Sequence, residues 1–218
     1  TSFHTDAGVV QAVRGVSFYV EKGESLGIVG ESGCGKSVSM LSIMRLLEDN
    51  ASLEADSLTF DGQDLLHISG KDMRAIQGNR IGMIFQDPMT SLNPLFTVEE
   101  QITSPLMRHQ NLKKKEAREK AQILELMAHM KNEYQTSVIL ITHDLGVIAS
   151  MCTRVIVMYG GLIMEEGAIE DIFYRTGHPY TAGLLASIPQ KSREKLVPIY
   201  GTPPDLLNPP AGCPFAAR

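Results

Sequence analysis

The chain has 218 residues, of which 43% are hydrophobic and 21% are charged, and its formal net charge is −5. This length fits one medium-sized domain with room for a small appendage, and the apolar fraction is sufficient for a buried core. The acidic balance argues against a nucleic-acid binder that uses a broad basic surface, and no apolar stretch approaches the roughly 18 residues of a membrane span. We therefore expect no nucleic-acid partner, no secretion signal and a cytosolic chain that reaches a membrane through partner proteins.

The N-terminal part predicts short strands, then a buried strand and a helix. Alternating apolar and polar residues favour strands at 9–13 and 16–20, and the apolar run SLGIVG favours a buried strand that ends at Gly30. Apolar residues at helical spacing follow over 36–47. The stretch SLTFDGQDL predicts a strand with a turn at Asp61-Gly62.

The remainder alternates strands and helices before a proline-rich tail. We predict a strand at 80–85 and helices at 98–109 and 113–134. A strand at 137–142, a hairpin turn at Gly160-Gly161 and one or two helices after Glu170 follow. The tail, TPPDLLNPPAGCPF, is expected to be extended and outside the main core. The fold class is therefore α/β, with a mixed core sheet and an antiparallel subdomain.

The segment GESGCGKS, residues 30–37, matches the pattern G-x-x-x-x-G-K-[ST] in full and lies between a predicted strand and a predicted helix. Its glycines allow successive backbone N–H groups to converge on an anion, and the helix adds the positive end of its dipole. Lys36 would neutralise the β- and γ-phosphates, and the Ser37 hydroxyl would take a position on Mg²⁺. The residues assigned to the nucleotide site are Gly30, Glu31, Ser32, Gly33, Cys34, Gly35, Lys36, Ser37 and Val38.

Two polar residues follow buried strands further along the chain. Gln86 comes after IGMIF and His143 after SVILIT, and strand ends of α/β folds usually face the ligand crevice. A glutamine there can ligate Mg²⁺ or orient a water, and a histidine can contact a γ-phosphate oxygen. For either residue taken alone, a structural role is the commoner alternative.

The order GESGCGKS, IFQDP, ILITHDL and VIVMYGGLIMEEG resembles the ATP-binding subunits of ABC transporters over about residues 9–167. The segment GHPYTAGLLASIPQ resembles the C-terminal extension of the oligopeptide, dipeptide and nickel importers. The resemblance implies a P-loop NTPase of the ABC-ATPase type with a partial helical subdomain. It divides the chain into an ATP-binding domain, 1–170, and an extension, 171–218.

The resemblance also implies roles for single residues. Gln86 would sense the metal and couple to the membrane subunits, His143 would contact the γ-phosphate, and Phe3 is the nearest candidate for stacking on adenine. With Lys36, the first two form the catalytic set, and Ser37 with Gln86 would hold Mg²⁺. The tail motif contains one cysteine, Cys213, so we predict no iron–sulfur cluster in this chain.

The implied partners are two membrane permease subunits, a second ATP-binding subunit and, indirectly, an extracytoplasmic substrate-binding protein. The implied location is the cytoplasmic face of the membrane. The leading function is ATP binding and hydrolysis for import of oligopeptides or dipeptides. The alternatives are a nickel importer, a non-hydrolysing nucleotide-binding module and a small-molecule kinase, although a kinase would leave HPYTAGLL unexplained.

One part of the family pattern is missing. Gln86 and His143 are separated by 143 − 86 = 57 positions, and this interval contains no LSGGQ-like signature and no apolar run ending in Asp-Glu. The join falls near AREKAQILELM, between about Lys120 and Gln122. Either a block is present but disordered, which we favour at this point, or it is deleted.

Overall fold

The structure is a computed structural model that covers residues 1–218. The residues that it describes are 1–84, 96–97, 100–101, 104, 107–108, 136–143, 145–187 and 198–218. The chain forms two compact units, residues 1–56 with 136–218 and residues 57–135. Each unit is described by itself.

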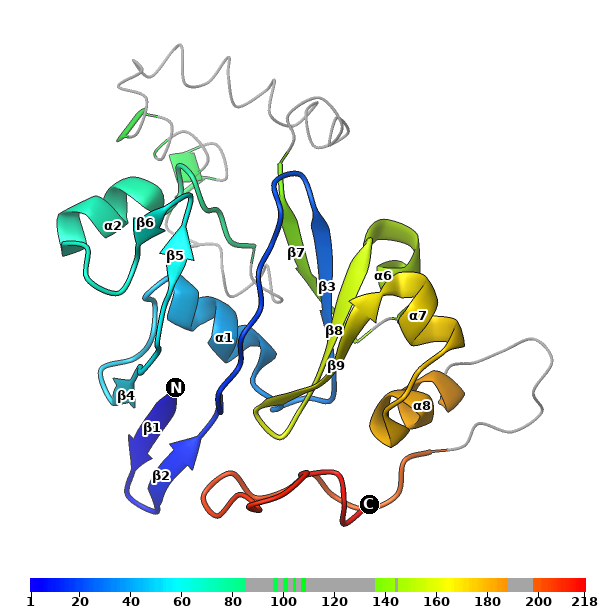
Figure 1. The fold of residues 1–218 in the computed structure, drawn as a ribbon. Helices are drawn as coiled ribbons and strands as arrows, with labels where there is room; N and C mark the ends of the chain where they lie inside the picture. Colours follow the sequence, from blue (N-terminus) through cyan, green and yellow to red (C-terminus); the bar gives the residue numbers. More distant parts are fainter. Residues whose placement is uncertain are drawn as a thin grey trace. The chain divides into compact units, whose positions relative to one another are not determined.

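A four-stranded sheet in the order β7-β3-β8-β9 is the centre of the first unit (Figure 1). Strand β3 (Ser25–Val29) lies between β7 (Val138–Ile141) and β8 (Arg154–Tyr159) and is parallel to both, whereas β9 (Leu162–Ala168) is antiparallel to β8. All of β3 is buried, and so is β8 after its first residue. Because parallel strands in the middle of a sheet are covered on both faces, their sequences are continuous apolar runs. The predicted mixed sheet is confirmed.

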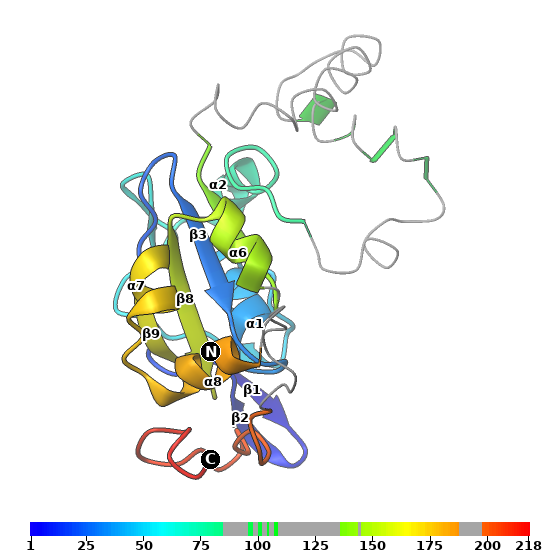
Figure 2. The same cartoon turned by 90° about the vertical axis from the view of Figure 1, so that its right-hand side faces the viewer.

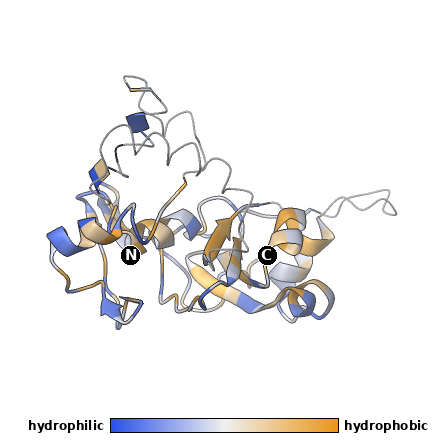
Figure 3. Ribbon diagram, turned by 90° about the horizontal axis from the view of Figure 1, so that it is seen from above, coloured by the Kyte–Doolittle hydropathy of each residue, from blue (hydrophilic) through white to orange (hydrophobic). Residues whose placement is uncertain are grey.

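Helices cover this sheet and complete its core. Figure 2 shows α1 (Lys36–Ile43) and α6 (Leu145–Met151) on the same side of the sheet. The predicted C-terminal helices are α7 (Ile169–Tyr174) and α8 (Pro179–Ala186). Strands and helices share one apolar cluster, and Figure 3 shows the central strands coloured as hydrophobic. Its buried members are Val29, Leu145, Ile148, Cys152, Val155, Val157, Tyr159, Ile172 and Tyr180.

The N-terminal strands differ from the prediction. A small antiparallel sheet has the order β2-β1-β4 and is formed by β1 (Ser2–Thr5), β2 (Gly8–Gln11) and β4 (Ala51–Ser52). The strand predicted at 9–13 overlaps β2, but the one at 16–20 is wrong. That segment alternates between half-buried and exposed residues without pairing to a strand in the described part of the chain.

The hairpin turn at Gly160-Gly161 is confirmed, with φ values of 54° and 79°. The helix predicted over 36–47 is shorter than expected and ends at Ile43. Arg45 then adopts a positive φ of 51°, which a continuing helix does not allow.

The second unit contains the strand and turn expected around Asp61-Gly62. They form the hairpin of β5 (Thr59–Phe60) and β6 (Gln63–Asp64), and both turn residues have positive φ, 49° and 75°. Helix α2 (Gly70–Ile76) follows, and its N-cap side chain, Ser69, accepts a hydrogen bond from the Asp72 N–H group.

The remaining predictions for this unit have mixed outcomes. The prediction of a strand over 80–85 is wrong for residues 80–84, which form no strand. Ile81 makes an isolated β-bridge with Gln77. Within 98–109 the described residues 100–101, 104 and 107–108 are helical. The helix predicted over 113–134 lies outside the described residues.

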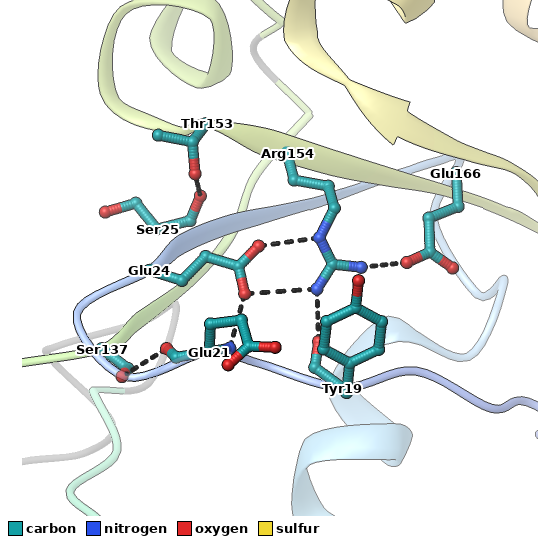
Figure 4. A network of polar contacts seen from close by, with 8 residues as sticks. All are labelled: Tyr19, Glu21, Glu24, Ser25, Ser137, Thr153, Arg154 and Glu166. Carbon is teal, nitrogen blue, oxygen red and sulfur yellow. Dashed lines mark hydrogen bonds and ion pairs between the residues drawn. The ribbon is translucent and has the colours of Figure 1, made fainter.

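Arg154 joins three segments at one end of the central sheet (Figure 4). Its guanidinium donates from Nε and Nη2 to the two carboxylate oxygens of Glu24, at 2.7 and 3.2 Å, and from Nη1 to Glu166 on β9. It also donates to the Tyr19 carbonyl and lies 4.3 Å from the centre of the Tyr19 ring. This bidentate contact with Glu24 fixes the start of β8 against the residue that precedes β3.

The proline-rich tail is not separate from the core, which corrects the prediction. Ile199 and Phe215 pack against the apolar cluster. The Phe215 ring meets Tyr159 edge-on, with ring centres 5.5 Å apart, and lies 5.2 Å from Tyr180. The half-buried Phe215 ring contributes to this docking, because an aromatic side chain removes a large apolar area from water.

No helix within the described ranges combines the length and the apolar character needed to cross a membrane.

Candidate nucleotide-binding site

The loop of residues 30–37 connects β3 to α1, as predicted. Its three glycines have positive φ, 149° at Gly30, 77° at Gly33 and 100° at Gly35. A Cβ atom on Gly30 would lie 2.1 Å from the Met158 carbonyl oxygen, and one on Gly35 would lie 2.5 Å from the Ala12 carbonyl oxygen. Gly33 has open space around it, so its backbone conformation alone favours glycine there.

The helix after the loop begins in a state that suits an anion. Gly35 is its N-cap in a left-handed conformation and has no side chain that could bond to the first turn, which contains no acidic residue. The N–H groups of a first helical turn have no partners within the helix, and the dipole makes that end positive. The eight-residue helix α1 therefore presents unpaired donors to a phosphate group.

Lys36 folds back across the loop. Its Nζ donates to the carbonyl oxygens of Gly30 at 2.9 Å and Glu31 at 2.7 Å, and lies 3.4 Å from Cys34 Sγ. These three partners are uncharged, so a phosphate can take the ammonium group from them without breaking an ion pair. Burial raises the pKa of the Cys34 thiol, which keeps it protonated beside the lysine.

The two serines of the loop and Val38 differ in exposure. Ser32 and Ser37 are exposed, and Val38 is half-buried within the first turn of α1. Among the described residues, no three His, Cys, Asp or Glu side chains come together in a way that could hold a metal ion. Of the two residues expected on Mg²⁺, Ser37 is in place at the helix start, and Gln86 lies outside the described residues.

His143 lies at the same edge of the sheet as the phosphate loop. Strands β3 and β7 are parallel with Ile28 opposite Ile141, and the Thr142 N–H group donates to the Ile28 carbonyl at 3.4 Å. Because the two strands are parallel and in this register, Gly30 after β3 and His143 after β7 follow the strands at the same edge of the sheet. The imidazole is exposed, and its contact with a γ-phosphate stays a prediction.

Phe3 lies on β1, where it pairs with Val10 and Ala51, and is half-buried. Its stacking on adenine stays a prediction.

Sequence reasoning missed two side chains that contact the first half of the loop, Tyr180 and Arg218, and a third, Tyr159, that contacts Arg218. The Glu31 N–H group donates to Tyr180 Oη at 2.9 Å, and its carboxylate accepts from Arg218 Nη1 at 2.8 Å. The same Nη1 donates to Tyr159 Oη at 2.9 Å. The HPYT segment drew attention to Tyr180, but nothing local in the sequence indicates that it reaches residue 31.

Two family models match the chain. Residues 13–146 match the model described as ABC transporter, and residues 164–218 match the one described as oligopeptide/dipeptide transporter, C-terminal region. Together they match both parts of the predicted resemblance.

Several curated proteins are similar over the whole chain. A dipeptide transport ATP-binding protein, DppD of Bacillus subtilis, is 43% identical, and the alignment covers 100% of this chain and 83% of that protein. Oligopeptide transport ATP-binding proteins named OppD, from Bacillus subtilis and Salmonella typhimurium, are 41% and 36% identical over 100% of the chain, with 78% and 83% of their own lengths covered. The DppD alignment has 279 positions and this chain 218 residues, so at least 279 − 218 = 61 positions have no counterpart here.

A solved structure of the ATP-binding cassette MJ0796 with ADP and Pi is 18% identical and superposes with a TM-score of 0.65. The match covers 77% of this chain and 95% of that one. It supports the fold, an α/β nucleotide-binding cassette.

Proposed function

Because this chain belongs to the family of ATP-binding subunits of ABC transporters, we propose that it binds ATP to energise import of dipeptides or oligopeptides across the cytoplasmic membrane. One observation carries the proposal. A phosphate loop of fitting geometry and a segment matching the peptide-transporter C-terminal region occur in one chain and touch each other. The relatives described above are named for dipeptide or oligopeptide transport, so the nickel alternative is not favoured.

In the proposed complex the loop binds the phosphates through its backbone N–H groups and through Lys36. Mg²⁺, when bound with the nucleotide, neutralises phosphate charge, and the Ser37 hydroxyl and Gln86 are the residues that would hold it. His143, at the neighbouring strand end, would donate to or accept from the γ-phosphate side of the site.

The proposed setting is the cytoplasmic face of the membrane. The chain would dock on two permease subunits and pair with a second ATP-binding subunit, and it would reach the extracytoplasmic substrate-binding protein through the permeases. The family relationship supports this arrangement.

The interval between Gln86 and His143 bears on turnover. The sequence runs without interruption from Lys120 through Ala121 to Gln122, so a block that is present but disordered does not account for the short interval. We infer a deletion of about sixty residues, which the 61 unmatched positions of the DppD alignment support. The deleted block would include the family's signature and its Asp-Glu pair.

This deletion favours a second candidate function for the chain as it stands, a module that binds ATP and turns it over slowly. Removing a general base usually lowers a rate by about 10²- to 10⁴-fold. ATP binding and fast turnover are therefore separable in this protein, and binding is the property to measure first.

The test of the proposed site is ATP affinity, measured by titration calorimetry on the full chain. Lys36→Ala should weaken binding by at least about tenfold, because a hydrogen bond to a charged group contributes roughly 1.5 to 3 kcal/mol. Lys71→Ala, which removes an exposed lysine from α2, is the control and should bind as the unmodified chain does. Equal affinity of the Lys36 variant would overturn the role assigned to the loop.

A further inference from the structure

The C-terminal segment 198–218 lies against the outer side of the phosphate loop and ends in a buried cation. The Arg218 side chain is 6% exposed. Besides its bonds to Glu31 and Tyr159, it donates from Nε to the Tyr200 carbonyl at 2.7 Å and from Nη2 to the Ile199 carbonyl at 3.1 Å. A buried guanidinium with partners on three of its nitrogens is held in one position.

Glu31 connects this cation to the phosphate site through three separate groups. Its carbonyl accepts from Lys36 Nζ, its N–H group donates to Tyr180 Oη, and its carboxylate binds Arg218. Any displacement of Glu31 therefore shifts an acceptor of the lysine that faces the nucleotide. The Glu31 side chain is 25% exposed, so the ion pair is partly shielded from solvent.

The tail that presents Arg218 is anchored at several other points. The Gln11 N–H group donates to the Leu206 carbonyl at 2.9 Å, and Arg14 donates to the Pro210 carbonyl at 3.1 Å. Pro204 and Pro214 come so close to Gly160 that a Cβ atom there would lie 3.1 and 3.0 Å from their rings. These contacts hold the segment against the N-terminal strand β2, the residues that follow it and the turn at Gly160.

The ion pair between Arg218 and Glu31 changes the charge next to the phosphate site. The Glu31 carboxylate belongs to a loop that binds a polyanion, and an uncompensated negative charge at that place would repel the phosphates. The ion pair with Glu31 raises the pKa of Arg218, which stays positive at every accessible pH. Arg218 thus cancels a charge that would oppose ATP binding and fixes the position of Glu31 at the start of the loop.

We infer that Arg218 is a positioning residue of the phosphate loop, through which the C-terminal segment controls affinity for ATP. This rests on the proposed function in one respect, that the loop binds ATP. By linkage, ATP must stabilise the docked segment to the same extent that the segment favours ATP.

The first measurement is ATP affinity of the full chain by titration calorimetry. Arg218→Met keeps the apolar stem and removes the charge, and it should weaken ATP binding by about tenfold, with a smaller effect on ADP, which has one charge fewer. Arg175→Met is the matched control, because Arg175 pairs with Asp171 on the exposed surface of α7, and it should bind as the unmodified chain does. Equal affinity of the Arg218 and Arg175 variants would overturn the inference.

The second measurement separates charge compensation from packing. In the double variant Arg218→Met/Glu31→Gln the uncompensated carboxylate is gone, so affinity should return to within about threefold of the unmodified chain. A double variant as weak as Arg218→Met alone would contradict the charge argument. If Arg218→Met does not fold, Arg218→Gln takes its place, because it keeps a hydrogen-bond donor and removes the charge. It should likewise weaken ATP binding by about tenfold, and affinity equal to that of the unmodified chain would refute the inference.

Hydrogen exchange measures the reciprocal effect. Saturating ATP should slow amide exchange of residues 199–207 in the unmodified chain and leave it unchanged in Arg218→Met. If the unmodified chain does not bind ATP at all, the proposed function fails. If it binds ATP and both readouts are insensitive to Arg218, the inference about the tail fails by itself.

Discussion

Gly30 lies where the backbone leaves no room for a Cβ atom. It follows β3 with a φ of 149°, and its α-carbon lies against the backbone of β8, next to the Met158 carbonyl. A backbone oxygen in the middle of a buried strand cannot move aside as a side chain can. The glycine is needed for packing as much as for phosphate binding.

The corresponding prediction is that Gly30→Ala lowers both stability and ATP affinity. The new methyl group would overlap the Met158 oxygen, so the free energy of unfolding should fall by at least about 2 kcal/mol. Urea titration followed by circular dichroism measures it. Gly82→Ala, where a Cβ atom has open space, is the control and should unfold as the unmodified chain does. A Gly30 variant of normal stability would show that the close approach is not as described.

At the scale of elements, the guanidinium of Arg154 ties β8 and β9 to the segment that precedes β3. The side chains of Arg154 and Glu24 are 14% and 11% exposed, so solvent screens this pair little compared with a surface ion pair. The hydrogen bond from Arg154 holds the pKa of Glu24 below its usual range. The ionised form is therefore the one that stabilises the fold.

A pH dependence of stability follows from that direction. In the unfolded chain Glu24 takes up its proton at its ordinary pKa, whereas the folded chain resists protonation until lower pH. The contribution of Glu24 is complete above the unfolded pKa and is lost as the pH falls through the folded value. The free energy of unfolding of the unmodified chain should therefore exceed that of Glu24→Gln at about pH 6, and the difference should shrink towards about pH 3.

Denaturant titrations at several pH values measure this difference. Asp171→Asn, which breaks an exposed pair with Arg175 within α7, should give a small difference at every pH. A difference between the unmodified chain and Glu24→Gln that stays constant with pH would contradict the assignment.

At the scale of the whole molecule, the chain combines a complete phosphate loop with an incomplete set of catalytic groups. The sequence between Gln86 and His143 contains no Asp-Glu pair after an apolar run. Loop and tail are nevertheless fully built, with β3, α1 and the residues around Arg218 in place. Binding and hydrolysis depend on different parts of the chain.

We predict that restoring the block restores turnover. Inserting the inferred block of about sixty residues, taken from a DppD relative, between Lys120 and Gln122 should raise the rate of phosphate release by about 10²- to 10⁴-fold, while ATP affinity changes little. The same insertion with the glutamate of the Asp-Glu pair changed to glutamine is the control. Uptake of labelled dipeptides, compared with nickel, by cells that depend on the restored chain then identifies the cargo. Rapid phosphate release from the chain without the insertion would contradict the deletion argument.

The local parts of the site can be predicted from short stretches of the sequence. GESGCGKS between an apolar strand and a helix specifies a phosphate loop, because glycine φ values, a lysine and a helix start are properties of neighbouring residues. The strand before His143 was equally clear, since the end of a buried parallel strand places the next residues at the ligand edge. At 16–20 the alternation of apolar and polar residues predicts a strand that does not form, because no strand in the described part of the chain pairs with this segment.

The contacts of the loop with the C-terminal segment follow only from the packing of the folded chain. Arg218 and Glu31 are 187 residues apart in the chain, and no spacing or motif relates them. Their contact depends on the packing of Phe215 against the rings of Tyr159 and Tyr180. Those two rings come together only when β8 and α8 have packed. A pattern in the sequence records what neighbours along the chain require, whereas an ion pair between distant residues is set by the folding of everything between them.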